Sequence, residues 1–543
     1  MSNLLEKASI VLTPTAYSDS TLHSIKPLQT LGSELVTNGG FDADSDWNKG
    51  TGWTISGGTA NQDGSNGILR QTNVASTNTK VKVTFNLTNY GGSGNLQVKF
   101  APSIHTLTLT GNGNYTVFTD GTNSTNGDVQ IITSSGFVGS IDNVSVKEVI
   151  DADFNFSRPT TGSATGIGSR ENSSGNIESV AADLPRIDYL GGTAHILLEP
   201  QSTNTATYSN DFTQGDIFNS SGDPTLSNSV LSANQSTAPD GTNTAQKLTD
   251  NNDSATGAIT LNYFGVTFTS GEASTVSIFV KKDTVRYFRI SITNLDTDQA
   301  ASFDLDTGLV SDGTGVMTDY GDGWYRCSVT TTTTTDLAGA VQFSISENSD
   351  RSGGNLRNGT KSTFLWGLQT EELSFPTSYI PTSGSPVTRS KDQAVSSGSS
   401  DLINSTEGVL YAEIAALADS GTYRTISLND GTNDECVRLR FHTNSNKIEG
   451  LIRDGGSGIA KIEHTVTDTR DFHKAAFEYK SGNCELWIDG VKRGTATDTF
   501  SLSTLTQLNF NQGTASDIFY GKVKCVTVFK ETLTDAQLAA LTS

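Results

Sequence analysis

Two strand-like segments near the end of the chain carry side chains suited to binding sugars. In ELWIDG, period-two alternation places Trp487 on the strand face opposite the apolar residues. In CVRLRFH it places Arg438, Arg440 and His442 opposite the apolar residues in the same way. Aromatic rings stack on sugar CH groups, and planar basic groups bind carboxylates. If the two strands share a sheet, these residues form one face suited to an acidic polysaccharide. The alternative is that Trp487 packs beneath a loop or a neighbouring domain and the arginines pair with carboxylates.

A second candidate group lies in the middle of the chain. Alternation within VRYFRISI and GWYRCSV places Tyr287, Arg289 and Arg326, together with Trp324, on the face opposite the core. These residues are candidates for glycan contact. The alternative is that GWYR is a purely structural strand, because tryptophan is usually mostly buried.

Catalytic patterns find little support in the sequence. The six histidines are scattered, and no HExxH motif or nucleophile elbow is present. With 58 acidic residues, some pair of carboxylates is inevitable in any fold and therefore indicates nothing. The sequence predicts a protein that is not an enzyme, with a capsule-degrading enzyme as the alternative from another class.

Composition favours short strands joined by tight turns. Hydrophobic residues make up 34% and charged residues 17%, and Thr, Ser, Asn and 54 Gly fill the remainder. These residue types disfavour helix interiors and suit turns. The four cysteines have no CxxC spacing, which predicts buried thiols without a disulfide framework: Cys327, Cys436, Cys484 and Cys525.

The formal net charge of -22 argues against nucleic acid as a partner, because phosphate backbones attract basic surfaces. No apolar run is long enough to insert into a membrane. The first residues show no basic start and no apolar h-region, so no signal peptide is expected and synthesis in a cytoplasm is predicted.

These observations predict an all-β fold of three tandem antiparallel β-sandwich domains with one short C-terminal helix. Runs such as KVKVTFNL and TVSIFVKK alternate with period two, as half-buried strands do. Thr534 and Gln537 have the spacing of a capping box before DAQLAALT. The expected parts are a docking segment at 1–32, a sandwich at 33–150, a connector at 151–205, and sandwiches at 206–392 and 400–543.

Three stretches resemble known families. ELVTNGGFD, GWTISGG and GSIDNVSVKEV resemble the carbohydrate-binding-like jelly rolls of phage structural proteins. A second region is similar to a segment that recurs in phage tail and virion proteins. Its motifs are the stretch from SRPTTGSATG to LPRIDYLGG, then LLEPQSTNTATYSNDF, GWYR, WGLQTE, FPTSYIPTSG and VTRSKD. In that family an Arg-Val-Asn type run is more usual where this chain has GIGSRENSSG. ELWIDGVKRG and VFKETLTDAQLAAL look like a laminin-G or concanavalin-like lectin domain.

The resemblance implies a bacteriophage virion protein of tail, fibre or surface decoration that binds host-surface polysaccharide non-covalently. Its implied partners are other virion proteins, contacted through the N-terminal segment, and further copies of the chain, with a trimer as the family-level expectation. A capsid decoration or tail scaffold without a ligand is the alternative within the same setting.

Jelly rolls of this kind often hold a structural calcium near their first and last strands. By that resemblance Asp42, Asp44 and Asp142 are candidate ligands, because calcium prefers hard oxygen donors. The alternative is that these acidic turns are solvated loops.

Overall fold

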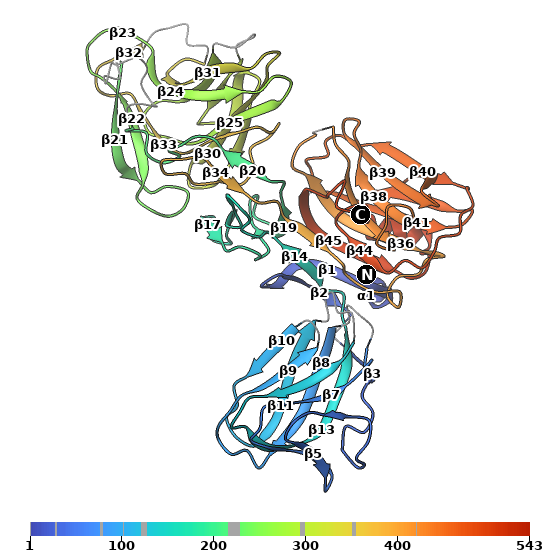
Figure 1. Cartoon of the computed structure of the whole chain (residues 1–543). Coiled ribbons are helices and arrows are strands. Elements are labelled where there is room, and N and C mark those ends of the chain that lie inside the picture. The colour runs from blue at the N-terminus through green and yellow to red at the C-terminus, as the bar shows by residue number, and fades with distance from the viewer. Residues whose placement is uncertain are drawn as a thin grey trace. The chain divides into compact units, whose positions relative to one another are not determined.

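The computed structural model describes residues 2–27, 30–75, 80–100, 103–120, 127–214, 228–293, 299–349, 355–419 and 421–543 (Figure 1). Strands dominate, and most of them pair antiparallel within five- to eleven-stranded sheets. The predicted all-β fold of antiparallel sandwiches is confirmed. No helix within the described ranges is long and apolar enough to cross a bilayer.

The chain divides into two compact units, residues 26–151 and residues 1–25 with 152–543. The smaller unit is a two-layer sandwich whose interior contains Trp47, Trp53 and Phe85. In β8 (Lys80–Thr88) every second residue is buried, as its alternation predicts. One sheet contains β11 (Gly113–Asp120), β8, β13 (Val138–Ile150), β6 (Thr59–Asp63) and β5 (Trp53–Ser56), with β3 (Thr30–Glu34) beside β13. The facing sheet contains β10 (Ser103–Leu107), β9 (Leu96–Phe100), β12 (Val129–Thr133), β7 (Gly67–Gln71) and β4 (Asn48–Lys49).

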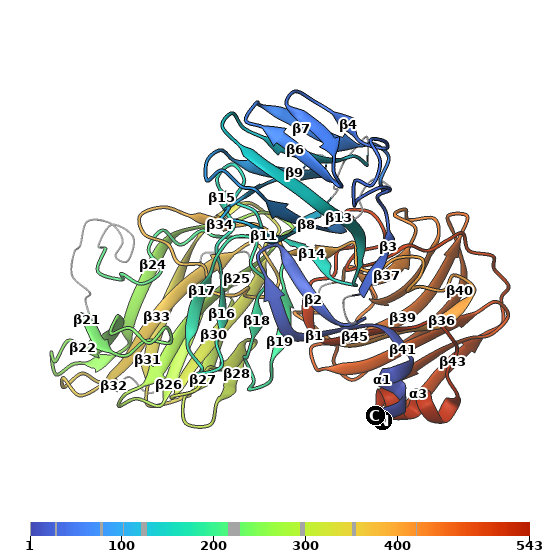
Figure 2. The same ribbon diagram turned by 90° about the horizontal axis from the view of Figure 1, so that it is seen from below.

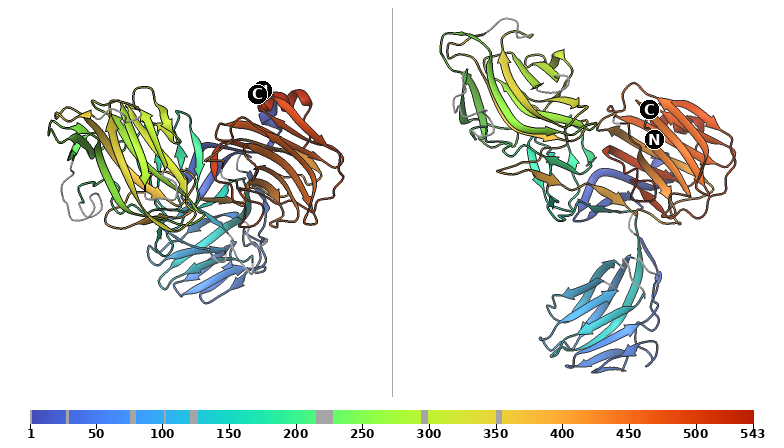
Figure 3. Two further views of the ribbon diagram at one scale, coloured as in Figure 1. Left: turned by 90° about the horizontal axis from the view of Figure 1, so that it is seen from above. Right: turned by 45° about the horizontal axis from the view of Figure 1, so that its top comes forward.

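The larger unit contains two sandwiches, of which the first is the middle sandwich, drawn in green and yellow in Figure 3. Its six-stranded sheet contains β21 (Ser229–Ser236), β22 (Ala245–Asp250), β33 (Ser362–Glu371), β25 (Ala273–Lys282), β30 (Trp324–Thr332) and β29 (Val316–Asp319). Its five-stranded sheet contains β24 (Ile259–Phe268), β31 (Leu337–Ser346), β26 (Tyr287–Thr293), β27 (Gln299–Asp304) and β28 (Leu309–Gly313). A separate short pair is β23 (Thr256–Gly257) with β32 (Asn355–Leu356).

The outer face of the six-stranded sheet is covered rather than open. Phe279, Trp324 and Trp366 form a second apolar cluster there, together with Tyr379 and with Ile177 from the connector. The Trp324 indole donates a hydrogen bond to the Thr237 carbonyl oxygen over 3.1 Å. This layer explains why both faces of β25 are buried, although TVSIFVKK also alternates.

The last sandwich has a five-stranded small sheet and an eleven-stranded large sheet. The small sheet contains β40 (Ser457–Thr465), β39 (Lys447–Asp454), β38 (Cys436–Phe441), β37 (Arg424–Asn429) and β44 (Gln507–Asn509). The path of the large sheet is β35 (Gln393–Val395), β14 (Phe154–Ser157), β2 (Thr21–Lys26), β1 (Ala8–Ser18), β45 (Gly521–Phe529), β36 (Glu407–Ala416), β41 (His473–Lys480), β42 (Cys484–Ile488) and β43 (Val491–Ala496). Off this path, β19 (His195–Leu198) pairs with β45, and β18 (Ile187–Asp188) pairs with β19.

The large sheet differs from the predicted division into separate leader, connector and lectin domain. Residues of β1 pair antiparallel with β45, for example Leu12 with Val526, and β19 pairs with the start of β45. The leader and the connector therefore supply strands to the last sandwich. Such pairing across some 500 residues is set by tertiary packing and leaves no local sequence signal.

The helix α3 (Asp535–Thr542) and its capping box are present as predicted: the Gln537 amide donates to the Thr534 hydroxyl, and the Gln537 side chain accepts from the Thr534 amide. The structure adds a second helix, α1 (Ser2–Lys7), that the sequence pattern does not indicate. Figure 2 shows α1 and α3 side by side, and residues of both pack against one apolar cluster on the outer face of the large sheet.

Short strands complete the connector and join it to the end of the middle sandwich. They are β15 (Ala164–Thr165), β34 (Val387–Arg389) and β20 (Ser202–Asn204) in one sheet, and β16 (Gly168–Glu171) with β17 (Ile177–Val180) in another. All four cysteines are free, and Cys525 is partly accessible while the other three are buried.

Candidate ligand-binding cleft

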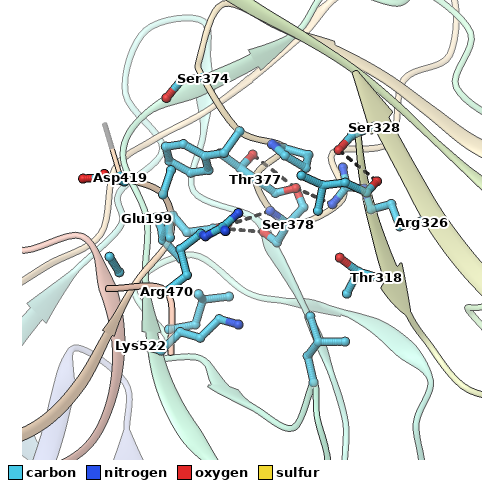
Figure 4. A pocket seen from close by; sticks show the side chains of 18 of the residues that line it. Glu199, Thr318, Arg326, Ser328, Ser374, Thr377, Ser378, Asp419, Arg470 and Lys522 are labelled. Atoms are coloured by element: carbon cyan, nitrogen blue, oxygen red, sulfur yellow. Dashed lines mark hydrogen bonds between the residues drawn. The ribbon is translucent and has the colours of Figure 1, made fainter. Parts of the chain in front are cut away.

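A cleft of about 500 Å³ lies within the larger unit, where the connector, the middle sandwich and the last sandwich meet (Figure 4). One wall comes from β29 and β30, and another from the turn after β36 and the start of β45. The segment 374–378 and connector residues complete it. The residues that line it include Asp188, Glu199, Thr318, Arg326, Ser374, Phe375, Pro376, Asp419, Asp468, Arg470 and Lys522.

The segment 374–378 is held by hydrogen bonds rather than by regular structure. The Thr377 amide donates to the Glu371 carboxylate over 3.0 Å, and Arg326 Nη1 donates to the Thr377 carbonyl oxygen over 2.6 Å. The Ser378 amide donates to the Glu199 carboxylate over 2.7 Å. These contacts fix the half-buried Phe375 at the cleft.

A buried charge network of three arginines and two carboxylates lies behind this segment. Arg158 binds Asp392 over 2.8 Å, and Arg186 and Arg389 each bind Glu199 over 2.6 Å. Arg186 also pairs with Asp392. All three arginine side chains have no exposed area, so the network ties the connector to the 389–392 segment inside the protein.

The cleft carboxyl groups with resolved shifts favour the ionised form. Burial by itself would raise the pKa of Glu199, but the charges of Arg389 and Arg186 outweigh it and lower that pKa to about 2. Hydrogen bonds from Arg470 lower the pKa of Asp468. Burial raises the pKa values of Glu171 and Glu478 to about 7, but neither residue lines the cleft.

Of the residues predicted to contact glycan, only Arg326 lines this cleft. Tyr287 and Arg289 lie on β26, in the other sheet of the middle sandwich, so the predicted shared face with Arg326 does not form. Arg289 binds Asp312 over 3.0 Å. The alternation predicts correctly which face of each strand is turned towards the core, but it cannot show whether two strands belong to one sheet.

The predicted face around Trp487 is also not assembled. Its strand β42 lies in the large sheet, whereas β38 with Arg438, Arg440 and His442 lies in the small sheet. Trp487 is only 6% exposed and packs in the apolar cluster beneath α1 and α3, so its ring offers no free face for stacking. The alternative places Trp487 beneath a loop or a neighbouring domain; the structure likewise buries it, but beneath two helices.

The basic residues of β38 bind internal partners. Arg438 is 1% exposed and contacts the Asn433 side chain. Arg440 Nε donates to Glu449 over 2.8 Å, and its guanidinium lies over the Tyr423 ring at 3.7 Å. Arg438, Arg440 and His442 are therefore buried polar residues and do not form the predicted face for an acidic polysaccharide.

His442, Glu449 and Glu463 have converging ligand atoms, the arrangement that a metal site needs. His442 Nδ1, however, accepts a hydrogen bond from the Asn444 amide over 2.8 Å. His442 Nε2 lies 3.5 Å from Glu449 and 3.7 Å from Glu463. Arg440 and Lys447 already neutralise the two carboxylates, so this group fits an ion-pair network better than a metal centre.

The predicted calcium ligands do not converge in the described residues. Asp44 pairs with Lys49, and Asp142 accepts from the amide of Asn143. Asp42, Asp44 and Asp142 form no group of three ligand atoms within reach of one ion. These residues fit the alternative of ordinary acidic turns.

Sequence reasoning missed the charge network and Phe375. The members of the network, Arg158, Arg186, Glu199, Arg389 and Asp392, fall in the stretches SRPTT, LPRIDYL, LLEP and VTRSKD. Arg186 and Glu199 lie in the apolar stretches LPRIDYL and LLEP, which indicates burial with a partner, since isolated charges are not left in a core. The polar stretches around Arg158, Arg389 and Asp392 carry no such signal.

No protein-family profile and no curated protein sequence matches the chain. Among solved structures, it is similar to the CBM40 of Ruminococcus gnavus IT-sialidase bound to α2,3-sialyllactose (14% identity, 27% of this chain and 94% of that chain, TM-score 0.23). It is also similar to the CBM22-1–CBM22-2 tandem domain of Paenibacillus barcinonensis Xyn10C (10%, 63% and 98%, TM-score 0.20). A third is mouse laminin α1 domains LG4-5 (12%, 50% and 91%, TM-score 0.18). At these TM-scores the likenesses assign no function to the chain.

Proposed function

We propose that this chain is a non-catalytic bacteriophage virion protein that binds host-surface glycan in the cleft. The observation that carries the glycan-binding part is the lining itself. Phe375 and Pro376 offer apolar surface, while Thr318 and Ser374 offer hydroxyl groups nearby. Sugars present apolar CH faces and hydroxyl edges, so this mixture suits them better than a purely apolar or purely charged ligand.

The proton chemistry of the lining supports binding rather than cleavage. Glycoside hydrolysis needs one carboxyl group that keeps its proton near neutral pH. Glu199 and Asp468 both have lowered pKa values, and Glu199 is held by two arginines. Neither of these two carboxyl groups is therefore suited to the role of the acid.

The virion part of the proposal is supported by the resemblance of residues 157–192, 197–212, 323–326 and 366–392 to phage tail and virion segments. Binding at one cleft is expected to be non-covalent and weak. Several copies on one particle would add their affinities through avidity.

The second candidate is a scaffold or decoration role without a ligand. The buried charge network favours this role, because its ion pairs hold the connector to the 389–392 segment. A glycan-binding assay separates the two candidates. Point variants are required, because deleting the last sandwich would remove β45, the partner of β1 and β19.

The test is a glycan array probed with the whole chain and with Phe375→Ala. We expect the wild type to bind a subset of bacterial surface glycans, and Phe375→Ala to bind them about tenfold more weakly through loss of stacking. Phe118→Ala, which removes a 45% exposed ring outside the cleft, is the matched control and should bind like the wild type. Equal binding by all three proteins would refute the assignment to this cleft.

The particle assignment has its own experiment. Labelled antibody against the chain should decorate phage particles in electron micrographs and should block adsorption to host cells. Decoration without any effect on adsorption would support the scaffold role, and absence of the chain from particles would refute a virion role.

A further inference from the structure

The charges that line the cleft do not balance one another. Of its four carboxylates, two pair with arginines and two accept hydrogen bonds from amides or a hydroxyl group. Glu199 binds two arginines, Asp468 binds Arg470 over 2.6 Å, and Asp419 accepts from the Ser445 hydroxyl and the Asn446 amide. Asp188 accepts from the amides of Glu171 and Leu190 over 2.9 and 2.8 Å.

Two cations of the lining, in contrast, have no carboxylate within ion-pair distance among the residues that the structure describes: Arg326 and Lys522. Arg326 is 4% exposed. Its guanidinium donates to the Thr377 carbonyl and, over 3.0 Å, to the Ser277 hydroxyl, and it lies over the Phe279 ring at 5.2 Å. Its Nε is buried without a hydrogen-bond partner. A buried cation without an anion is unfavourable, so the site favours an incoming negative group.

Lys522 differs from the next lysine on the same strand. Lys524 lies over the Phe472 ring at 3.9 Å and 3.6 Å from Glu413, so its charge is used inside the protein. Lys522 lines the cleft, and Figure 4 shows it and Arg326 on separate walls of the cavity. A ligand between these walls would meet a cation on either side.

We propose that the cleft selects glycans that carry an anionic group, which binds between Arg326 and Lys522. This inference rests on the proposed glycan-binding function and names its substrate class. The shared chemistry is a carboxylate or phosphate attached to a sugar chain, as in uronate polymers and in polyol-phosphate polymers. Guanidinium groups bind both kinds of oxyanion in a bidentate manner.

The test measures dissociation constants for three probes: uronate-containing oligosaccharides, the same oligosaccharides after carboxyl reduction, and glycerol-phosphate oligomers bearing sugars. We expect at least one anionic probe to bind about tenfold more tightly than the reduced, neutral probe, because a hydrogen bond to a charged group is worth about that factor. The two anionic probes distinguish carboxylate from phosphate as the preferred group.

Lys522→Gln removes one cation from a half-exposed position and should fold normally. It should weaken binding of the anionic probe about tenfold and leave the neutral probe within about twofold. Lys480→Gln is the control, because it makes the same charge change far from the cleft. Lys480 lies at the end of β41 opposite Glu407, about 30 Å along β36 from the cleft. This variant should bind both the anionic and the neutral probe like the wild type. Arg326→Gln should act like Lys522→Gln if thermal unfolding shows that it folds.

The outcomes separate this inference from the proposed function. Equal binding of charged and neutral probes, with no effect of Lys522→Gln, would overturn the anion selectivity while leaving glycan binding intact. Absence of binding to every probe would count against both.

Discussion

At the residue scale, the most unusual feature of this protein is a set of charged side chains placed where apolar ones are expected. Arg158, Arg186 and Arg389 have no exposed area, and Glu199 and Asp392 are shared among them. Burying charges is costly, so such a set is stable only when every member has a partner. The segment that forms the cleft depends on it, because Ser378 donates to Glu199.

Asp392→Asn tests this dependence. The change removes the charge that Arg158 and Arg186 share, and it should lower the free energy of unfolding of the larger unit by about 3–5 kcal/mol. Asp322→Asn, which breaks an exposed pair with Lys281, should cost less than about 1 kcal/mol. Denaturant titration measures both values, and a similar small loss in each would show that the network is dispensable.

The pH dependence of stability provides a second test at this scale. The pKa of Glu199 is lowered from 4.5 to about 2 in the folded protein. Its stabilising contribution is therefore complete above about pH 4.5 and is lost as the pH falls from 4.5 towards 2. Over that range the melting temperature of the wild type should fall more steeply than that of Glu199→Gln. Parallel curves for the two proteins would contradict the assignment.

At the element scale, the sequence predicts individual strands well and their pairing poorly. The alternation in KVKVTFNL places the buried residues of β8 correctly. The same reasoning could not place β38 and β42 in different sheets, nor bring β1 beside β45, because pairing depends on contacts between distant segments. Those pairings decide where Trp487 lies, and the assignment of β26 and β30 to different sheets decides where Arg326 lies, so the cleft could not be predicted.

The helix α3 is the element with the clearest local code, and its cap can be tested. Thr534→Ala removes the acceptor for the Gln537 amide and should destabilise the helix by about 1 kcal/mol, whereas Thr534→Ser should retain the cap. Hydrogen exchange of residues 535–542 should become faster in the alanine variant only. Unchanged exchange would mean that packing over Trp487 alone holds the helix.

At the scale of the whole molecule, the composition correctly predicts β-sandwiches. The order of the segments along the chain does not predict which of them fold together. The smaller unit, residues 26–151, has its own apolar core. The larger unit is formed by the residues that precede and follow it in the sequence, 1–25 and 152–543. Residues 1–32 and 151–205 are predicted to be a leader and a connector, because β45, the partner of both β1 and β19, lies near the other end of the sequence.

This organisation predicts that residues 26–151 fold when expressed alone. The isolated fragment should give a cooperative thermal transition and the circular dichroism of a β-sandwich, because its core contains no residue from outside 26–151. A fragment of residues 152–543 should be less stable than the larger unit as a whole, since it lacks β1, a neighbour of β45. Failure of 26–151 to fold would contradict the division into two units.

The central claim is that the cleft holds a glycan and leaves it intact, and one measurement addresses both halves. The whole chain is incubated with a panel of purified bacterial surface polysaccharides, and binding and polymer length are followed in the same samples. We predict reversible binding to acidic members of the panel, weakened by Phe375→Ala, with no change in polymer length. Shortened polymer with new reducing or unsaturated ends would contradict the account.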